Sequence, residues 1–313
     1  MKVLILRFSS IGDIVLTSPV VRCLRETYPD ATIHYCTKLK YRELVCHNPN
    51  IDGCHYLETT LANLLTRLWR ENYDLVIDLH NNLRSNLIKH FLGKRRVTVD
   101  KISVRKWLYV RFKLMVMPDT HIVDRYMNTV RGLGVVNDNR GLNHFLGADE
   151  QVPLSSLPPS FRRSYAAYAI GGEHRTKRLP VARMIDLCRT IGQPVVLVGG
   201  PGDRAAGEAV RLALGDAHIY NACGLFSINQ SASVVRQAQV VYSHDTGLMH
   251  IAAAFKKNIV SIWGSTTPQL GMYPYQTAYR VIENKKVACR PCSKIGRNQC
   301  PGGHFDCMNT LSF

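Results

Sequence analysis

Acidic residues and long hydrophobic runs are both scarce in this sequence. Only 23 of the 313 residues are Asp or Glu, against 40 Lys and Arg, so the formal net charge is +17. No apolar run approaches the ~18 residues of a membrane-spanning helix, and Arg7 and Asp13 interrupt the apolar opening segment. We therefore expect no signal peptide or membrane anchor, and a cytoplasmic protein whose basic surface suits an anionic partner.

Common nucleotide-binding and nucleic-acid-binding signatures are missing as well. The turn at residues 9–13 contains a single glycine, so it matches neither the dinucleotide-binding fingerprint nor a P-loop. The chain also carries no recognisable nucleic-acid reader motif and no aromatic-rich binding sheet. A basic nucleic-acid-binding protein therefore remains only an alternative from another functional class, and we expect no nucleic-acid partner.

Short apolar runs alternate with segments of helical periodicity along the chain. This pattern predicts strands at residues 2–8, 31–36, 73–79, 165–170, 194–199, 240–243 and 258–263. It predicts helices at residues 13–27, 61–70, 180–191, 203–214, 228–237 and 247–255, with residues 84–125 largely helical. Such alternation is typical of parallel sheets covered on both faces. We predict an α/β protein with two doubly wound domains, residues 1–155 and 156–313, separated by the polar, proline-rich stretch 149–160.

Asp13 follows the first predicted strand, at the edge of a parallel sheet where α/β proteins bind ligands. In one interpretation its carboxylate caps the next helix by accepting backbone N–H bonds. In the other it is a general base that takes a proton from an incoming hydroxyl, with helix N–H groups stabilising its ionised form. The residues alone leave both interpretations open.

Residues 174–180 follow another predicted strand and combine hydroxyl and basic side chains. A threonine and a lysine at a helix N-terminus suit a diphosphate, and Thr176 and Lys177 stand at such a position. An exposed basic loop would have the same composition. The glycine-rich turn at 198–204, which contains Asp203, is a weaker signal of the same kind.

Residues 240–250 form the most specific of these segments. A buried strand runs into Asp245, a predicted N-cap, then into Thr246 and Gly247, with His250 one turn along the helix. A capped helix with a core histidine is the alternative interpretation. Residues 262–268 repeat the pattern of a strand followed by glycine and hydroxyls, so two anion-binding corners on adjacent strands would form a nucleotide-diphosphate pocket.

Together these motifs resemble glycosyltransferase family nine, the bacterial lipopolysaccharide heptosyltransferases. The matching segments span essentially the whole chain in the expected order: LILRFSSIGDIVLTSPV, DLHNNLRS, TKRLP, VGGPGDR, SHDTGLMHIAAA and the terminal cysteine motif. The resemblance implies the GT-B architecture of two Rossmann-like domains facing a cleft. It also implies an inverting transfer of heptose from ADP-heptose to a lipopolysaccharide core acceptor; a relative using another nucleotide sugar for a surface glycan is the alternative.

The resemblance further assigns roles to individual residues. It makes Asp13 the catalytic base and places the donor against Thr176, Lys177, Asp203, Asp245, Thr246, Gly247 and His250. Because Lys177 and a helix N-terminus would stabilise the leaving diphosphate, catalysis requires no metal cofactor. The absence of a D-x-D carboxylate pair beside this predicted pocket agrees with that expectation.

The resemblance places the acceptor, an anionic lipid-linked core oligosaccharide, in the N-terminal domain. Our candidate contacts there are Arg84, His121 and Arg125. The basic stretch 84–125 also contains aromatic residues and suits an anionic membrane surface, with a solvated face as the alternative. We therefore expect a protein peripheral to the cytoplasmic face of the inner membrane.

Four of the ten cysteines cluster near the C-terminus, at Cys289, Cys292, Cys300 and Cys307. Their C-x2-C-x7-C-x6-C spacing is compatible with a structural zinc site in which His304 could replace one ligand. Free thiols and disulfides are the alternatives.

Overall fold

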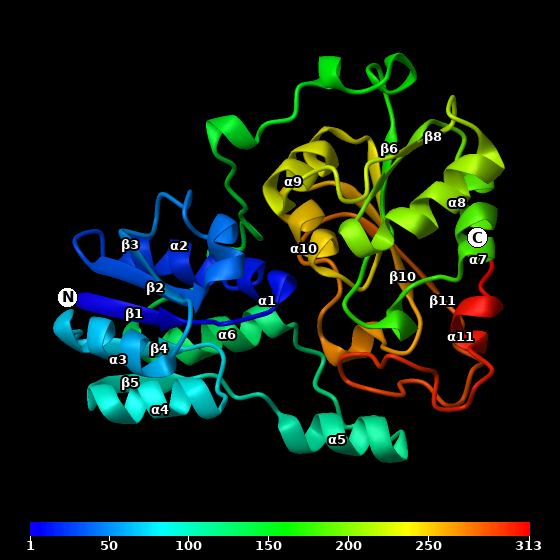
Figure 1. Ribbon diagram of the computed structural model, residues 1–313. Coiled ribbons are helices and arrows are strands. Elements are labelled where there is room, and N and C mark those ends of the chain that lie inside the picture. Colours follow the sequence, from blue (N-terminus) through cyan, green and yellow to red (C-terminus); the bar gives the residue numbers. More distant parts are fainter. The chain divides into compact units, whose positions relative to one another are not determined.

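The computed structural model describes residues 1–313, which divide into two compact units (Figure 1). Unit 1 comprises residues 1–101 and 120–145, and unit 2 comprises residues 102–119 and 146–313. The predicted boundary at residue 155 lies inside unit 2, because the segment before it is bonded to that unit. Val152 N donates to Ser233 Oγ (3.0 Å), and Glu150 Oε2 accepts from Asn229 Nδ2 (2.8 Å).

Unit 1 is built on a parallel five-stranded sheet in the order β3-β2-β1-β4-β5. Its strands are β1 (Lys2–Leu6), β2 (Thr32–Lys38), β3 (Gly53–Leu57), β4 (Leu75–Asp78) and β5 (Arg95–Thr98). Its α-helices are α1 (Ile11–Val15), α2 (Ser18–Thr27), α3 (Leu61–Arg70), α4 (Leu83–Leu92) and α6 (Ile122–Val130). The central strands β1 and β4 are almost wholly buried, which confirms the apolar runs predicted there.

Unit 2 is built on a parallel six-stranded sheet in the order β11-β10-β9-β6-β7-β8. Its strands are β6 (Ala166–Ala169), β7 (Val195–Val198), β8 (Ile219–Asn221), β9 (Val240–His244), β10 (Asn258–Trp263) and β11 (Tyr279–Glu283). Its α-helices are α5 (Ser103–Phe112), α7 (Val181–Thr190), α8 (Arg204–Leu214), α9 (Ile228–Gln237), α10 (Gly247–Ala254) and α11 (Asp306–Asn309). None of the helices in the structure is both long and apolar enough to cross a membrane.

Short 3-10 helices connect many of these elements. They span η1 (Leu39–Leu44), η2 (Arg131–Leu133), η3 (Ala148–Glu150), η4 (Leu154–Ser156), η5 (Pro159–Phe161), η6 (Arg175–Lys177), η7 (Pro201–Asp203) and η8 (Pro268–Leu270). Residues 174–177 of the predicted phosphate-binding loop thus include one such turn, η6.

The sequence did not predict the four edge strands β3, β5, β8 and β11. The outer strand β5, for example, begins with two exposed arginines, and every residue of β3 is only half-buried, so neither is a continuous apolar run. The predicted helix 13–27 is also two helices, α1 and α2. Pro19 has no backbone N–H and occupies the first turn of α2, so a new helix begins at Ser18.

Both sheets share one strand topology. In chain order within each unit, the strands are arranged 3-2-1-4-5, with a sixth strand after the fifth in unit 2. This is the Rossmann order, in which ligands bind beyond the carboxyl ends of the first and fourth strands, where the strand order reverses. In unit 1 that point lies between β1 and β4, and in unit 2 between β6 and β9.

Candidate active site

Three strand ends of unit 2 bring polar side chains together at this reversal point. Lys177 lies in the loop after β6, Asp245 directly follows β9, and Thr266 lies just beyond β10. Lys177 Nζ is 2.7 Å from Asp245 Oδ2, and Thr266 Oγ1 donates to the same oxygen at 2.8 Å. The predicted corners after β9 and β10 are therefore adjacent, and they meet the predicted basic loop.

Helix α10 begins immediately after this ion pair. Its N-cap, Thr246, has extended backbone geometry, and its side chain makes no capping hydrogen bond. The first N–H groups of a helix lack intrahelical partners and carry partial positive charge, so they suit a phosphate group. Gly172, in the loop after β6, allows close approach here, because a Cβ at that position would lie 3.3 Å from Thr246 Cγ2.

Two residues predicted to touch the donor are held by protein groups. The buried Thr176 hydroxyl donates to Arg297 O (2.9 Å) and accepts from Ser265 Oγ (2.9 Å). Asp203 forms an ion pair with Arg178 (2.8 Å) and accepts from the Gly200 N–H (2.9 Å). These contacts shape the loops around Lys177, and direct donor contact by either residue stays a prediction.

His244, the last residue of β9, stabilises the loop that contains Lys177. Its imidazole is fully buried, and Nε2 accepts hydrogen bonds from Leu179 N (3.1 Å) and from the Tyr168 hydroxyl (3.0 Å). Burial lowers the pKa of His244 to about 4, so the ring is neutral at physiological pH. His244 thereby ties the end of the predicted basic loop to the strand that precedes Asp245. His250 is also buried, on α10.

Unit 1 carries its own charged group at the equivalent point. Asp13, in α1 just beyond β1, accepts from Ser10 N (3.2 Å) and Ser10 Oγ (2.8 Å) and forms an ion pair with Arg7 at 2.7 Å. The buried Tyr126 hydroxyl also hydrogen-bonds to it. Both predicted roles remain compatible with this geometry: Asp13 bonds the N-terminal backbone of α1, and its carboxylate is about a fifth exposed.

The sequence did not predict that Arg7 would lie beside Asp13. Burial alone lowers the pKa of the Arg7 guanidinium, but the Asp13 carboxylate reverses that effect and raises it above its ordinary value. Arg7 also donates to Ser9 O (2.8 Å) and Leu79 O (2.5 Å), which join the loops after β1 and β4. The ion pair stabilises the charged carboxylate, the form that a general base needs.

The end of β4 adds a second, deeper ion pair. Asp78 is fully buried, lies 2.8 Å from Lys89 Nζ, and accepts from the backbone N–H groups of His80 (2.9 Å) and Asn81 (2.7 Å). This pairing fixes the loop 79–82 within the DLHNNLRS segment. Burial and the Arg7 charge lower the pKa of His80 to about 4.

A family model described as glycosyltransferase family 9 (heptosyltransferase) matches residues 61–301, well over half of the chain. The chain belongs to this family. Membership confirms the predicted family and class of enzyme, a glycosyltransferase, and it leaves the nucleic-acid-binding alternative without support.

Individual relatives have low sequence identity with this family 9 member but match it over most of its length. The lipooligosaccharide heptosyltransferase 2 of Haemophilus influenzae is 24% identical over 330 residues, covering 95% of this chain and 93% of that one. The lipopolysaccharide heptosyltransferase 2 of Escherichia coli K12 is 24% identical over 292 residues, covering 86% and 84%. The solved structure of E. coli ADP-heptose lipopolysaccharide heptosyltransferase II has a TM-score of 0.73 at 23% identity, covering 99% and 98%. This likeness confirms the predicted fold class.

The acceptor candidates of this glycosyltransferase differ in accessibility. Arg84 is exposed in the first turn of α4. His121 is buried, and its Nδ1 accepts from Val123 N at 3.1 Å as the N-cap of α6. Arg125 is buried one turn later in α6, and burial lowers its pKa. Acceptor binding by these three residues stays a prediction, and the capping bond gives His121 a structural role.

The C-terminal cysteines lie near one another, and all ten cysteines of the chain are free thiols. Cys289 Sγ is 3.8 Å from Cys292 Sγ and 3.8 Å from His304 Nε2. Burial and the Cys289 charge raise the pKa of Cys292 to about 11. Burial raises the pKa of Cys307 to about 12. No two of these cysteines are joined by a disulfide bond in the structure.

Proposed function

We propose that this glycosyltransferase transfers heptose from ADP-heptose to an anionic, lipid-linked lipopolysaccharide core. The observation that carries the proposal is Lys177, held by Asp245 at the reversal point of the unit 2 sheet, beside the N-terminus of α10. The names of the relatives support the choice of sugar and acceptor. A structural neighbour, an E. coli heptosyltransferase solved with ADP-2-deoxy-2-fluoro heptose, has a TM-score of 0.66 at 22% identity.

In this proposal the donor diphosphate binds where α10 begins. Lys177 supplies a positive charge, and the amides of Thr246 and Gly247 supply hydrogen-bond donors to the phosphate oxygens. These groups stabilise the negative charge that develops on ADP as the bond to the sugar breaks, so the transfer needs no metal. Asp245 and Thr266 keep the lysine in place between turnovers.

The acceptor hydroxyl is activated by Asp13. The hydroxyl oxygen attacks the anomeric carbon from the face opposite to ADP as the bond between that carbon and the diphosphate breaks, so the configuration at the carbon inverts. The proton of the hydroxyl passes to the Asp13 carboxylate. Arg7 holds the charged carboxylate, and the Ser10 N–H and hydroxyl bonds fix its orientation.

Calorimetric titration of ADP, UDP and GDP tests the donor site. We expect selective binding of ADP that is at least about tenfold weaker in Lys177→Ala, because a charge-assisted contact is worth ~1.5–3 kcal/mol. Lys285→Ala, at a highly exposed lysine of the same unit, is the matched control and should bind like the wild type. Preference for UDP or GDP would favour another nucleotide sugar, and unchanged ADP affinity in Lys177→Ala would contradict the placement of the diphosphate.

Helix α5 supports a further part of the proposal, attachment to an anionic membrane surface. Trp107 and Phe112 are more than half exposed and contact each other edge to face, with ring centroids 5.2 Å apart. Leu114 and Met115 extend this exposed apolar surface beyond the helix, and the same segment contains Arg105, Lys106, Arg111 and Lys113. Exposed aromatics beside cations are typical of helices that lie in a lipid interface.

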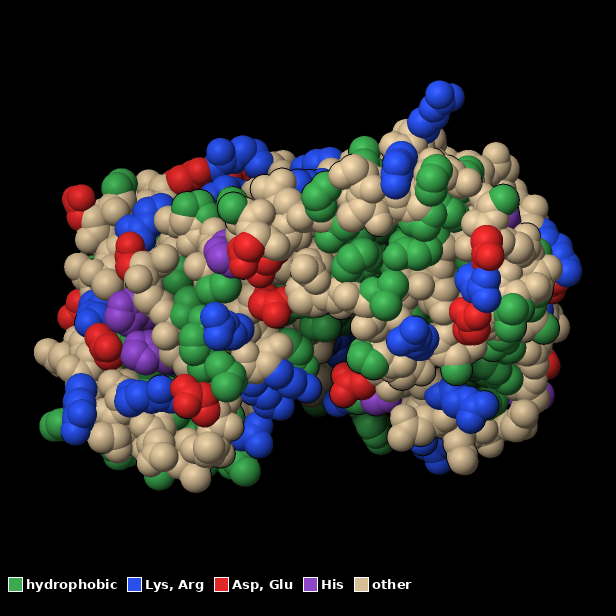
Figure 2. Space-filling model, turned by 45° about the horizontal axis from the view of Figure 1, so that its top comes forward, with side chains coloured by type: hydrophobic (Ala, Val, Ile, Leu, Met, Phe, Trp, Pro, Cys, Tyr) green, Lys and Arg blue, Asp and Glu red, His purple; other side chains and the backbone are tan.

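The positive charge of the protein as a whole is spread more widely than the basic residues of the α5 segment. On the face that Figure 2 shows, Lys and Arg side chains are spread over the surface with Asp and Glu among them. Vesicles containing anionic lipid should therefore bind through α5, less strongly at high salt. Trp107→Ala should weaken binding, whereas Leu212→Ala, an exposed leucine of α8, should not. Equal binding by both variants would remove α5 from the proposal.

A structural zinc ion at the C-terminal cysteines completes the proposal. Sulfur ligands about 2.3 Å from a tetrahedral zinc lie ~3.8 Å apart, which matches the 3.8 Å between Cys289 Sγ and Cys292 Sγ. His304, Cys300 and Cys307 are the candidates for the other positions. Zinc and iron analysis of protein purified without a histidine tag tests this, with Cys289→Ser as the variant that should lose the metal. A metal-free wild type would leave these cysteines as free thiols.

A further inference from the structure

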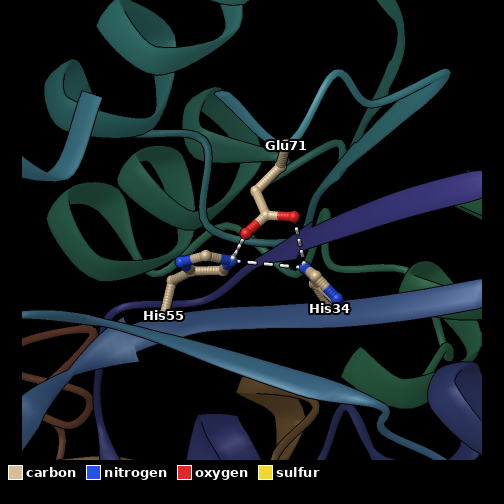
Figure 3. Close-up of side chains that lie close together, drawn as sticks. All are labelled: His34, His55 and Glu71. Carbon is tan, nitrogen blue, oxygen red and sulfur yellow. Dashed lines mark hydrogen bonds and ion pairs between the residues drawn. The ribbon is translucent and has the colours of Figure 1, made fainter. Parts of the chain in front are cut away.

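Two histidines and a glutamate cluster in unit 1 on the outer strand β3, its neighbour β2 and the end of α3 (Figure 3). His34 lies on β2, His55 on β3, and Glu71 is the C-cap of α3. His34 pairs in register with Gly53, two residues before His55, so both imidazoles project from the same face of the sheet. Figure 3 shows the three side chains pointing toward one another.

The spacing of the three side chains is close to that of a metal's ligands. His34 Nδ1 is 3.2 Å from His55 Nε2, and the Glu71 carboxylate oxygens lie 3.7 Å from His55 Nε2 and 3.9 Å from His34 Nδ1. Nitrogen or oxygen atoms bound about 2.0–2.1 Å from a tetrahedral zinc are ~3.3–3.4 Å apart. Small side-chain movements would therefore place one atom from each of the three residues at bonding distance from one ion.

The three side chains of the cluster are partly exposed to solvent. The side chains of His34 and His55 are each 13% exposed and that of Glu71 is 30% exposed, so the cluster is shielded but reachable from solvent. Gly53 provides room for the His34 ring, because a Cβ there would lie 2.8 Å from it.

Two neighbours compete for the same atoms. Lys2 Nζ lies 2.5 Å from Glu71 Oε2, and the Tyr73 hydroxyl lies 2.9 Å from His34 Nδ1. Lys2 donates to Oε2, whereas the oxygen that faces His55 is Oε1. The partly exposed lysine can swing into solvent, and the tyrosine can turn its hydroxyl toward a metal-bound water.

We propose that His34, His55 and Glu71 form a binding site for a zinc-type divalent transition metal ion. Imidazole and carboxylate donors suit zinc, whereas magnesium and calcium prefer oxygen ligands alone. Water completes the coordination. The ion ties the edge strand β3 and its neighbour β2 to the segment that leads into β4. It has no part in the transfer reaction, whose residues lie beyond the carboxyl ends of the strands.

Zinc titration of a variant that lacks the C-terminal thiols tests this site separately. In Cys289→Ser/Cys292→Ser protein without a histidine tag, calorimetry should detect one zinc per chain and a raised unfolding temperature. Adding His34→Gln should weaken zinc binding by at least ~100-fold, since even outer-shell partners of a metal are worth 10–100-fold. His90→Gln, at an exposed histidine of α4, should leave the affinity unchanged.

A variant that binds zinc more tightly provides a second readout, because loss of folding cannot increase zinc affinity. Lys2→Met removes the competing ammonium, so it should tighten zinc binding several-fold in the same background. Unfolding of His34→Gln in chelator, compared with its parent, separates loss of a ligand from loss of structure. Absence of zinc binding in the parent, equal affinity in His34→Gln, or weaker binding in Lys2→Met would each overturn the proposal.

Discussion

Acidification should destabilise unit 2 through His244. The imidazole is fully buried and bonded through Nε2 to Leu179 N and the Tyr168 hydroxyl, and its pKa is lowered by burial to about 4 from 6.5. Between these values the unfolded chain takes up a proton that the folded chain does not. The free energy of unfolding therefore falls as the pH falls from 6.5 toward 4.

The size of this effect follows from the pKa difference. One pKa unit corresponds to ~1.4 kcal/mol, so a shift from 6.5 to about 4 corresponds to about 3 kcal/mol, of which about 2–3 kcal/mol is lost by pH 4.5. His55 and His80 also have pKa values near 4 and act in the same direction, so the wild type alone cannot isolate His244.

Urea unfolding of His244→Gln provides the comparison. Glutamine keeps an acceptor for Leu179 N but does not titrate, so any packing cost is the same at every pH. Between pH 7 and pH 4.5 the wild type should lose about 2–3 kcal/mol more than the variant. His90→Gln, at an exposed position, controls for loss of a histidine. Parallel pH dependences in the wild type and His244→Gln would refute the reasoning, because they would mean that His244 gains its proton equally in both states.

Three substitutions test other parts of the structure. Asp13→Asn should lower turnover ~10²–10⁴-fold while ADP affinity stays within a few-fold by calorimetry; retained turnover would exclude Asp13 as the base. Thr266→Val removes a bond to the Asp245 carboxylate and should cost ~1.5–3 kcal/mol in urea unfolding; an unchanged midpoint would argue against that bond. Gly264→Ala places a Cβ 2.5 Å from Met308 Cε and should cost ~1–3 kcal/mol, with normal stability showing that α11 can move aside.

The sequence predicted the parts of the fold that are locally encoded. Central parallel strands such as β4 are buried on both faces, so they appear in the sequence as apolar runs. The polar side chains that directly follow these runs show where the strands end. Lys177 and Asp245 were predicted on that basis, and their contact follows from the pairing of β6 with β9. The edge strands were not predictable in this way, because half-exposed strands such as β3 mix polar and apolar residues.

Contacts between residues far apart in the chain could not be predicted from the sequence either. Arg7 and Asp13 were both visible, yet their ion pair depends on how the chain turns after β1. His34, His55 and Glu71 are separated by 16 residues or more, and they meet only because β3 pairs with β2 in one register. A shift of that register by one residue would turn His55 to the other face of the sheet.

Unit 1 thus carries two separate groups of functional side chains, the histidine cluster and the residues around Asp13. Lys2, beside Glu71, is the first residue of β1, and Asp13 lies in α1, beyond the other end of that strand. His55 lies on β3, two strand spacings or ~10 Å from β1. Substitutions more than ~7–10 Å apart without shared partners usually act independently. Changes at the histidine cluster should therefore alter metal affinity and stability but not the loss of turnover caused by Asp13→Asn. If the double variants were strongly non-additive, the metal would have to act on the reaction through β1 itself.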